Sequence, residues 1–360
     1  MHASRSGSPR GATFPEPAVP LPWCDVPVVS MREVAAAASV SVGTVSNVLN
    51  APDKVAPATV ARVQAAIDKL GFVRNDAARQ LKAGRSRSVG LVVLDIGNPF
   101  FTDIARAAER RAGEHNLTVL LGTSDDDATR ERAYVDAFDE QRVYGLLVSP
   151  VGEDLNRLVA LRERGTPVVL VDRDGGGTPF DSVAVDDVAG GCLAVQHLCA
   201  TGRRKIAFVG GPGTLRQIRD RRRGAADAVG RTPGATLEII DTDAPSVLAG
   251  RAVGEQLRRR ARQDRPDAVF CANDLLAIGV LQALSLTGDL RVPDDMALVG
   301  YDDIDFARSA VVPLTSVRQP TGEIGTTAVD LLIGAAEDAT GRNPEHVVFQ
   351  PELVVRDSTS

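Results

Sequence analysis

Residues 30–50 read SMREVAAAASVSVGTVSNVLN, and this stretch decides how the N-terminal part of the chain folds. Its alanine-rich run predicts a first short helix. Ser30 and Glu33 stand three residues apart before that run, so the Ser30 hydroxyl can accept from a first-turn amide while the Glu33 carboxylate bonds back to the Ser30 N–H. Ser41 can cap a second helix over residues 42–49. The stretch therefore predicts two short helices joined by a tight turn.

The second of these helices has two distinct faces. Val45, Val48 and Leu49 recur at helical spacing, and we expect them to pack on the first helix. The outward face is small and largely polar, and it consists of Val42, Gly43, Ser46 and Asn47. Such a face suits a helix that enters the major groove of DNA. An ordinary pair of packed helices explains the pattern equally well, so on these residues alone both interpretations stay open.

Length and composition limit the class of protein. The chain has 360 residues, of which 44% are hydrophobic and 4% aromatic. This is enough for two or three domains, and the balance is common in α/β layers with buried parallel strands. No apolar run is long enough for a membrane helix. Residues 1–28 carry six prolines and no apolar core of signal-peptide length, so we expect a disordered tail and a cytoplasmic protein.

The cysteines give no metal site. Cys24, Cys192, Cys199 and Cys271 are scattered, and none forms a CxxC pair. Cys199 lies two residues from His197, but no further ligand is near in the sequence. We therefore expect reduced thiols, no bound metal and no cofactor.

Charge is distributed unevenly along the chain. Residues 29–87 contain nine Lys and Arg against four acids, a balance of +5, whereas the whole chain carries −6. Residues 1–28 are balanced, so the remainder carries −11 (−6 minus +5). A basic head on an acidic body is what a phosphate-binding module joined to a regulatory or catalytic body would need.

A third helix and a short basic segment follow the helix pair. Pro57 fits the first position of a helix that Gly71 can end, which completes a three-helix head over residues 29–74. Residues 75–87 then predict a short hinge helix, with Asn75 as its cap, and a polar linker. Leu81 is the one large apolar residue of that helix, and cations including Lys82 surround it. It can be a wedge that enters the minor groove, or an anchor to the next domain; the local sequence favours neither.

From residue 88 to the C-terminus the pattern is an alternation of short apolar runs and amphipathic helices. Nine strand-like runs occur within about 220 residues. This βαβ repetition predicts an α/β body with two doubly wound parallel sheets. Many of the strands end in polar residues, namely Asp95, Asp172–Arg173, Asp186–Asp187, Asn273–Asp274 and Asp302–Asp303. Each of these can simply cap the next helix, but together they indicate a cleft beyond the carboxyl ends of the strands.

Catalytic motifs are missing from this α/β pattern. There is no GxGxxG after a strand, no GxxxxGK[ST], and no arrangement of the four histidines that suggests a triad. The acidic run at 125–127 precedes a helix and is expected to cap it. We therefore expect a protein that is not an enzyme. The alternative to a regulator is a solute-binding protein that only captures a small ligand, which would need an export signal and no helix-turn-helix.

Several motifs, in order, resemble the lactose-repressor (LacI/GalR) family of bacterial transcription regulators. They are MREVAAAASVSVGTVSNVLN, NDAARQLKAGRSRSVGLVV, NPFF, VFCANDLLAIG, VPDDMALVGYDD, PLTSVRQP and PELVVRDS, and the similarity runs from about residue 30 to the C-terminus. The resemblance implies a helix-turn-helix head, a hinge helix and a periplasmic-binding-protein-like body of two subdomains, with the chain crossing between them near 187, 315 and 346.

The resemblance also implies roles on DNA. Val42, Gly43 and Asn47 match positions that read base edges, although Gly43 has no side chain to read with, and Thr44 and Ser46 match backbone contacts. Leu81 matches the leucine that hinge helices insert into the minor groove, with Ala78 and Lys82 facing the same groove. Asn75, at the start of the hinge helix, is also expected to contact DNA. The protein is thus expected to be a homodimeric repressor of a near-palindromic operator.

For the body, the resemblance implies a small-molecule effector, expected to be a sugar or sugar derivative. The matching positions are Phe100, Phe101, Asp172, Gln217, Arg221, Asn273 and Asp302. An aromatic wall with carboxylates, amides and a guanidinium suits a polyol, although the same groups can hold a purine-like ligand.

Overall fold

The computed structural model describes residues 29–73, 86–285, 290–338 and 342–360. The chain divides into two compact units, Met1–Arg79 and Gln80–Ser360, which are called the head and the body below. Of the expected DNA contacts, Asn75, Ala78, Leu81 and Lys82 lie outside the described residues, as does the 1–28 tail.

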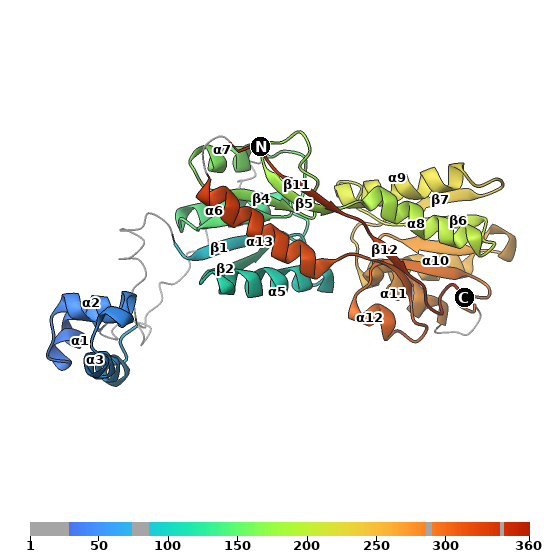
Figure 1. The fold of residues 1–360 in the computed structure, drawn as a ribbon. Helices are drawn as coiled ribbons and strands as arrows, with labels where there is room; N and C mark the ends of the chain where they lie inside the picture. The colour runs from blue at the N-terminus through green and yellow to red at the C-terminus, as the bar shows by residue number, and fades with distance from the viewer. Residues whose placement is uncertain (1–28, 74–85, 286–289, 339–341) are drawn as a thin grey trace, which may run out of the picture. The chain divides into compact units, whose positions relative to one another are not determined.

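The head contains three α-helices (Figure 1), and they pack around a small apolar core. They are α1 (Met31–Ala37), α2 (Val42–Asn50) and α3 (Pro57–Leu70), with a short 3₁₀ turn, η1 (Pro52–Lys54), before α3. The expected capping box is present: Ser30 N donates to Glu33 Oε2 at 2.7 Å and Glu33 N donates to Ser30 Oγ at 3.4 Å. Val34, Val45 and Val63 are fully buried and join the three helices.

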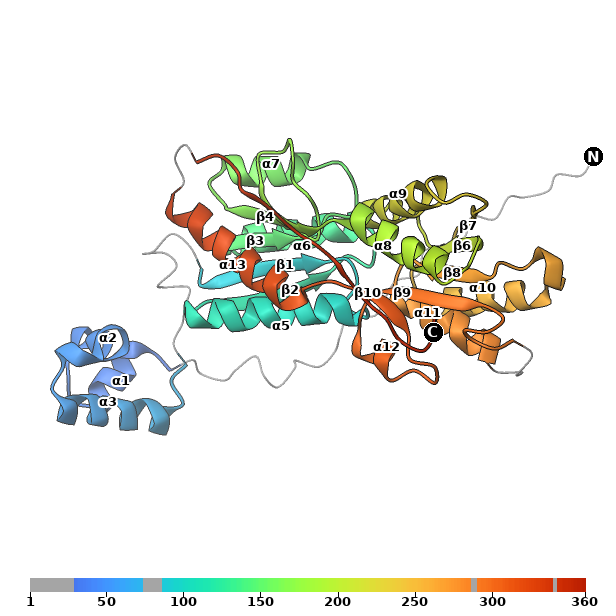
Figure 2. The same ribbon diagram turned by 45° about the vertical axis from the view of Figure 1, so that its right-hand side comes forward.

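The body contains two six-stranded sheets, each with helices packed against it (Figure 2). The first sheet has the order β11-β5-β4-β3-β1-β2, and all its strands are parallel. Its strands and helices are β1 (Ser88–Val93), α5 (Pro99–Glu114), β2 (Thr118–Thr123), α6 (Ala128–Glu140), β3 (Gly145–Val148), α7 (Asn156–Glu163), β4 (Val168–Val171), β5 (Asp181–Val185), α13 (Thr321–Glu337) and β11 (His346–Phe349).

The second sheet has the order β12-β10-β9-β8-β6-β7, in which only β12 runs antiparallel to its neighbour. Its elements are α8 (Asp187–Ala200), β6 (Lys205–Val209), α9 (Arg216–Gly230), β7 (Thr236–Ile240), α10 (Val247–Arg259), η2 (Arg262–Asp264), β8 (Ala268–Cys271), α11 (Asp274–Ser285), β9 (Ala297–Asp302), α12 (Asp305–Arg308), β10 (Thr315–Arg318) and β12 (Glu352–Val354). The expected pair of parallel-sheet subdomains is therefore confirmed.

The strand count exceeds the nine expected by β10, β11 and β12, which have three or four residues each and include polar or charged residues. Each of these short strands adjoins a passage of the chain from one sheet to the other. The chain passes between the sheets after β5, after β10 and after β11. The second and third passages thus lie a few residues beyond 315 and 346.

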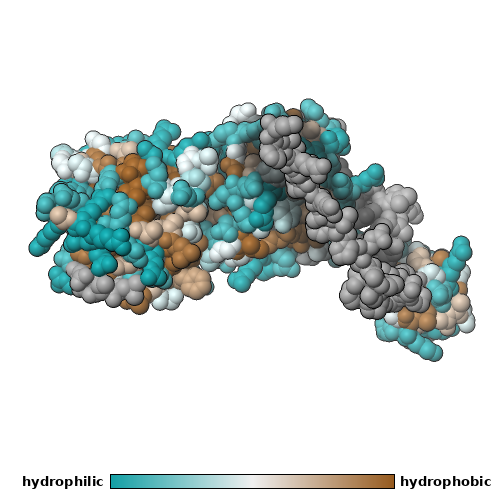
Figure 3. All heavy atoms as spheres, turned by 180° about the vertical axis from the view of Figure 1, so that it is seen from behind, coloured by the Kyte–Doolittle hydropathy of each residue, from teal (hydrophilic) through white to brown (hydrophobic). Residues whose placement is uncertain are grey.

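Apolar and polar residues alternate over the surface of the body that Figure 3 shows, without an all-apolar band. Among the described residues, no helix has both the length and the hydropathy needed to span a membrane.

Candidate functional sites

Helix α2 presents an open surface at its N-terminal half. Val42 is 40% exposed, and Gly43 and Asn47 are exposed too, whereas Val45 and Val48 are buried in the head. A Cβ atom built on Gly43 would meet only Ser41 Oγ, at 3.6 Å, so this turn of helix can approach another surface closely. The Asn47 side chain makes no hydrogen bond with a described residue.

Thr44 and Ser46 are half-buried on the same helix, and both already have local partners. Thr44 Oγ1 lies 2.9 Å from Ser41 Oγ, whose oxygen also accepts from the Thr44 N–H at 3.0 Å. Ser46 Oγ accepts from the Asn50 amide at 3.2 Å. The free amide on this surface is therefore that of Asn47, while the hydroxyls help to hold the helix.

A cleft lies where strands of both sheets of the body end. The structure brings all seven expected effector residues to it: Phe100, Phe101, Asp172, Gln217, Arg221, Asn273 and Asp302. Other residues lining it are Leu94, Asp95, Asn98, Asp126, Leu215, Ile218, Pro245 and Ala272, around about 500 Å³ of space that is partly open to solvent. The cleft combines an apolar wall with buried charged groups.

Arg221 is the only cation among the lining residues, and it is held on several sides. Its Nε donates to Asp187 Oδ1 at 2.7 Å, its Nη1 donates to the Ala272 carbonyl at 2.7 Å, and its Cζ lies 3.7 Å from the centre of the Tyr301 ring. Asp302 Oδ1 lies 3.7 Å from Nη1. Burial works against its charge, but Asp187 and the other acidic groups nearby raise the pKa of the guanidinium. Arg221 is thus a fixed positive charge that organises the acids around it.

Two hydrogen-bonded pairs cross the cleft from one subdomain to the other. Gln217 Nε2, on α9, donates to the Asp172 carbonyl at 2.9 Å and to Asp172 Oδ2 at 2.8 Å. Asn98 Nδ2, at the start of α5, donates to Asp302 Oδ2 at 3.2 Å. Because each pair joins residues of different sheets, the relative position of the subdomains depends on side chains that a ligand would also contact.

Two of the carboxyl groups that line the cleft, those of Asp172 and Asp302, are strongly desolvated. Burial, followed by the negative charge of Asp187, raises the pKa of Asp172 to about 8. Burial also raises the pKa of Asp302 to about 6, opposed by Arg221 and by hydrogen bonds from Asn98 and Gln319. Oδ1 of Asp172 is buried and has no hydrogen-bond partner. Because Asp172 lines the cleft, a bound hydroxyl is a candidate partner for this unsatisfied oxygen.

Comparisons with known proteins agree with this combination of head and cleft. Residues 30–75 match the family described as bacterial regulatory proteins, lacI family, and residues 195–359 match the periplasmic binding protein-like domain. The HTH-type transcriptional repressor PurR of Photobacterium profundum is 33% identical over 338 residues, which is 92% of this chain and 98% of that protein. The chain belongs to the LacI family.

Solved structures of LacI-family proteins resemble the whole chain. The lac repressor dimer bound to operator and the anti-inducer ONPF has a TM-score of 0.79 at 27% identity, covering 92% of this chain and 99% of that one. A complex of the transcriptional regulator CelR with cellobiose has a TM-score of 0.67 at 32% identity, with the same coverage. The similarity to these structures covers both the helix-turn-helix head and the body of this LacI-family chain.

Two polar residues that hold Asp302 in this LacI-family member were not predicted from the sequence. Asn98 and Gln319 both donate to Asp302, Gln319 Nε2 at 2.8 Å from Asp302 Oδ1. Both stand in motifs that carried the resemblance, NPFF and PLTSVRQP, but neither was among the residues named as strand ends. The acidic run at 125–127 was only partly explained by capping: Asp127 caps α6, whereas Asp126 lines the cleft.

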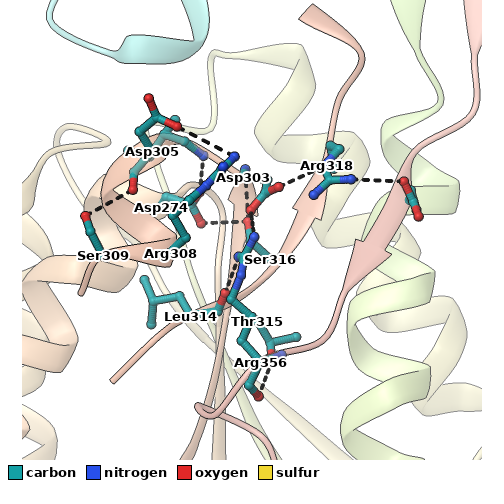
Figure 4. Close-up of polar contacts among 12 residues, drawn as sticks. Asp274, Asp303, Asp305, Arg308, Ser309, Leu314, Thr315, Ser316, Arg318 and Arg356 are labelled. Atoms are coloured by element: carbon teal, nitrogen blue, oxygen red, sulfur yellow. Dashed lines mark hydrogen bonds and ion pairs between the residues drawn. The ribbon is translucent and has the colours of Figure 1, made fainter. Parts of the chain in front are cut away.

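The polar residues at strand ends have two kinds of role: some line the cleft, and others hold neighbouring helices or strands in place. Asn273 serves both interpretations, because it lines the cleft and its Oδ1 accepts from Leu276 N in α11 at 2.9 Å. Asp303 lies away from the cleft and pairs with Arg318 Nε at 2.8 Å and with Arg356 Nη2 at 2.6 Å (Figure 4). Arg318 also lies 3.4 Å from Glu352 at the start of β12. Adjacent residues, Asp302 and Asp303, therefore connect the cleft with the strands at which the chain passes between subdomains.

Proposed function

We propose that this protein is a sequence-specific transcriptional repressor whose affinity for its operator is set by a small molecule, a sugar or sugar derivative, bound in the cleft. It acts as a homodimer in the cytoplasm and has no enzymatic role. The observation that carries the proposal is that one chain joins an open helix-turn-helix surface to a cleft whose two walls are linked by Gln217–Asp172 and Asn98–Asp302.

On DNA, helix α2 is the reading element. Asn47 offers an unpaired amide for a bidentate contact with adenine, and Val42 offers an apolar contact for a thymine methyl group. Thr44 and Ser46 fit backbone contacts that position the helix without reading sequence. Because Gly43 contributes no side chain, specificity also depends on Leu81, Ala78 and Lys82 of the hinge and on how easily the operator deforms.

Dimerisation follows from the geometry of such reading. One α2 helix contacts only a few base pairs, so two heads must meet the major groove about one helical turn apart for adequate specificity. The operator is accordingly near-palindromic. The basic balance of residues 29–87 makes the affinity fall steeply with salt, because each phosphate contact releases condensed counterions.

In the cleft, Phe100 and Phe101 supply an apolar surface for the face of a sugar ring, while Asp172, Gln217, Arg221, Asn273 and Asp302 surround its hydroxyls. CelR, a similar regulator, has cellobiose bound in its structure. A ligand that changes the Gln217–Asp172 and Asn98–Asp302 contacts would shift the angle between subdomains, and a coupling of about 1–3 kcal/mol is typical for such allostery.

Selection of binding sites from a random-sequence DNA library tests the DNA part of the proposal. We expect enrichment of one near-palindromic sequence with half-sites about one turn apart. Fluorescence anisotropy on that sequence, with and without a panel of sugars and nucleobases, then tests the effector part. Failure to enrich any sequence would refute the repressor, and ligand binding without a change in operator affinity would refute the coupling.

A further inference from the structure

The charged groups that line the cleft are unbalanced. Four carboxyl groups, those of Asp95, Asp126, Asp172 and Asp302, face one guanidinium, that of Arg221. That guanidinium is already engaged by Asp187, by the Ala272 carbonyl and by the Tyr301 ring. A ligand that brings a phosphate or carboxylate would therefore meet an excess of carboxyl groups and a single guanidinium that is already paired with Asp187.

The hydrogen-bond donors of the cleft are also committed. Asn98 donates to Asp302, Gln217 donates to Asp172, and Asn273 Nδ2 donates to the Pro245 carbonyl at 3.0 Å. These amides hold the walls of the cleft together or close its edge. Each of these amides thus donates at least one N–H to the protein, so an acceptor-rich ligand must compete with contacts that hold the cleft walls.

Acceptor oxygens, by contrast, remain available. Oδ1 of Asp172, a residue only 4% exposed, is buried without a partner. A ligand hydroxyl satisfies this oxygen whether or not Asp172 is protonated, because a hydroxyl both donates and accepts. The cleft thus contains an unpartnered, buried polar group in addition to its acidic rim.

Asp126 forms the second available acceptor. Its half-buried carboxyl group has no hydrogen bond or ion pair with any described residue. Burial raises its pKa to about 6, with further contributions from the charges of Asp95 and Asp125. The nearby Asp95 uses Oδ1 to accept from Gly97 N at 2.7 Å. Two acidic groups without a cation of their own thus lie at the more exposed part of the cleft.

We propose that the effector is a donor-rich polyol that carries no negative charge, and that Asp126, with Asp95, binds its hydroxyl or ammonium groups at the exposed part of the cleft. The inference rests on the proposed effector function and narrows its ligand class. It selects neutral sugars and amino sugars, and it excludes sugar phosphates and sugar acids. The apolar wall of Phe100, Phe101 and Leu215 covers the ring face of a neutral sugar and of an amino sugar alike.

A matched ligand panel tests this selection. The panel contains D-glucose, D-glucosamine and glucose 6-phosphate, D-ribose and ribose 5-phosphate, and cellobiose, and binding to the full chain is measured by thermal shift and calorimetry. We expect at least one neutral or amino sugar to bind. Its phosphate ester should bind at least about ten-fold more weakly, a difference of about 1.4 kcal/mol.

Asp126→Asn is the informative variant, because asparagine tolerates the positive φ of 58° at this position and keeps the size of the side chain. It should lower the ratio of glucosamine affinity to glucose affinity. It should also reduce the factor by which glucose 6-phosphate binds more weakly than glucose. Asp125→Asn removes the same charge next door, outside the cleft lining, and should leave both ratios within about two-fold.

The outcomes separate this inference from the function on which it rests. If a sugar binds and changes operator affinity, yet its phosphate binds equally well or better, the inference is wrong and the proposed function stands. Equal effects of Asp126→Asn and Asp125→Asn would remove Asp126 from the site. If no compound of the panel binds, the sugar effector itself is contradicted, and the inference with it.

Discussion

The side-chain amide of Asn98 lies 3.2 Å from Asp302 Oδ2, and this hydrogen bond joins the two subdomains of the body directly across the cleft. Asn98 also caps α5, because its Oδ1 accepts from Phe100 N at 3.1 Å. One residue thus fixes the start of the helix that carries the aromatic wall and the distance from that wall to the opposite carboxylate. This double role makes Asn98 a sensitive test of how the cleft is closed.

Asn98→Asp should destabilise the body in a pH-dependent manner. The variant keeps the capping oxygen but replaces the donor to Asp302 by a second carboxylate, so near pH 8 we expect a loss of about 1–3 kcal/mol in the free energy of unfolding. Below about pH 6 the two acids can share a proton and much of the loss should vanish. Urea unfolding at pH 5 and pH 8 measures the difference.

Asn98→Ser is the matched control, since a serine hydroxyl can cap the helix without adding charge. Its deficit should be similar at both pH values. An Asn98→Asp protein as stable as the original chain at pH 8 would show that Asn98 and Asp302 are not in contact.

Asp172 should make the body less stable as the pH rises. Its pKa is about 8 in the folded chain against an ordinary value of 3.8, so between these values the native state binds more protons than the unfolded state. The stabilising contribution is present below about pH 4 and is lost as the pH rises toward 8. Asp172→Asn removes this titration and can still accept from Gln217, so it should gain stability at pH 8, on the order of a few kcal/mol.

The measurement is again unfolding by urea, at pH 4.5 and pH 8. The exposed neighbour Asp174 supplies the control, because Asp174→Asn changes the same formal charge without a buried carboxyl group. A gain at pH 8 that appears equally in both variants would mean that bulk charge, rather than the burial of Asp172, is responsible.

The head and the two sheets could be predicted from sequence because their signals are local. Ser30 and Glu33 form a capping box within one turn. The continuous apolar run of β1 directly indicates a buried strand. Phe100 and Arg221 reached the candidate site only through the family resemblance, since nothing in their local sequence indicates a cleft. Local pattern and family motif therefore contributed different parts of the prediction.

The contacts that could not be predicted from the sequence depend on long-range geometry. Gln319 meets Asp302 because β10 pairs with β9 and then leaves the sheet, and β10, which reads TSVR, is not an apolar run that the sequence pattern reveals. Asp126 and Asp127 are adjacent acids with different environments, one in the cleft and one on a helix end. Only the path of the turn after β2 separates them, and composition does not encode that path.

Arg356→Met should destabilise the second subdomain by roughly 1–3 kcal/mol. Arg356 pairs with Asp303, whose side chain is only 1% exposed, and its Nη1 donates to the Leu314 carbonyl at 2.6 Å (Figure 4). Its loss leaves Asp303 with Arg318 alone. The double variant Asp303→Asn/Arg356→Met should recover part of the loss, because removing both charges avoids an uncompensated buried acid. A double-mutant cycle by thermal unfolding that shows simple additivity would contradict this pairing.

Asn47→Ala should weaken binding to the selected operator and relax its sequence preference at one position of each half-site. The Asn47 amide is exposed and has no partner in the head, so its removal should leave the stability of the head unchanged while it costs about 1–3 kcal/mol of discrimination against the wrong base.

Ser46→Ala is the control on the same helix. Loss of a backbone contact should lower affinity uniformly across operator variants, without a change in preference. Anisotropy titrations on operators that differ at single positions measure both effects. If Asn47→Ala lowered affinity for every sequence by the same factor, Asn47 would be a backbone contact, and direct reading would fall to Val42 and the hinge.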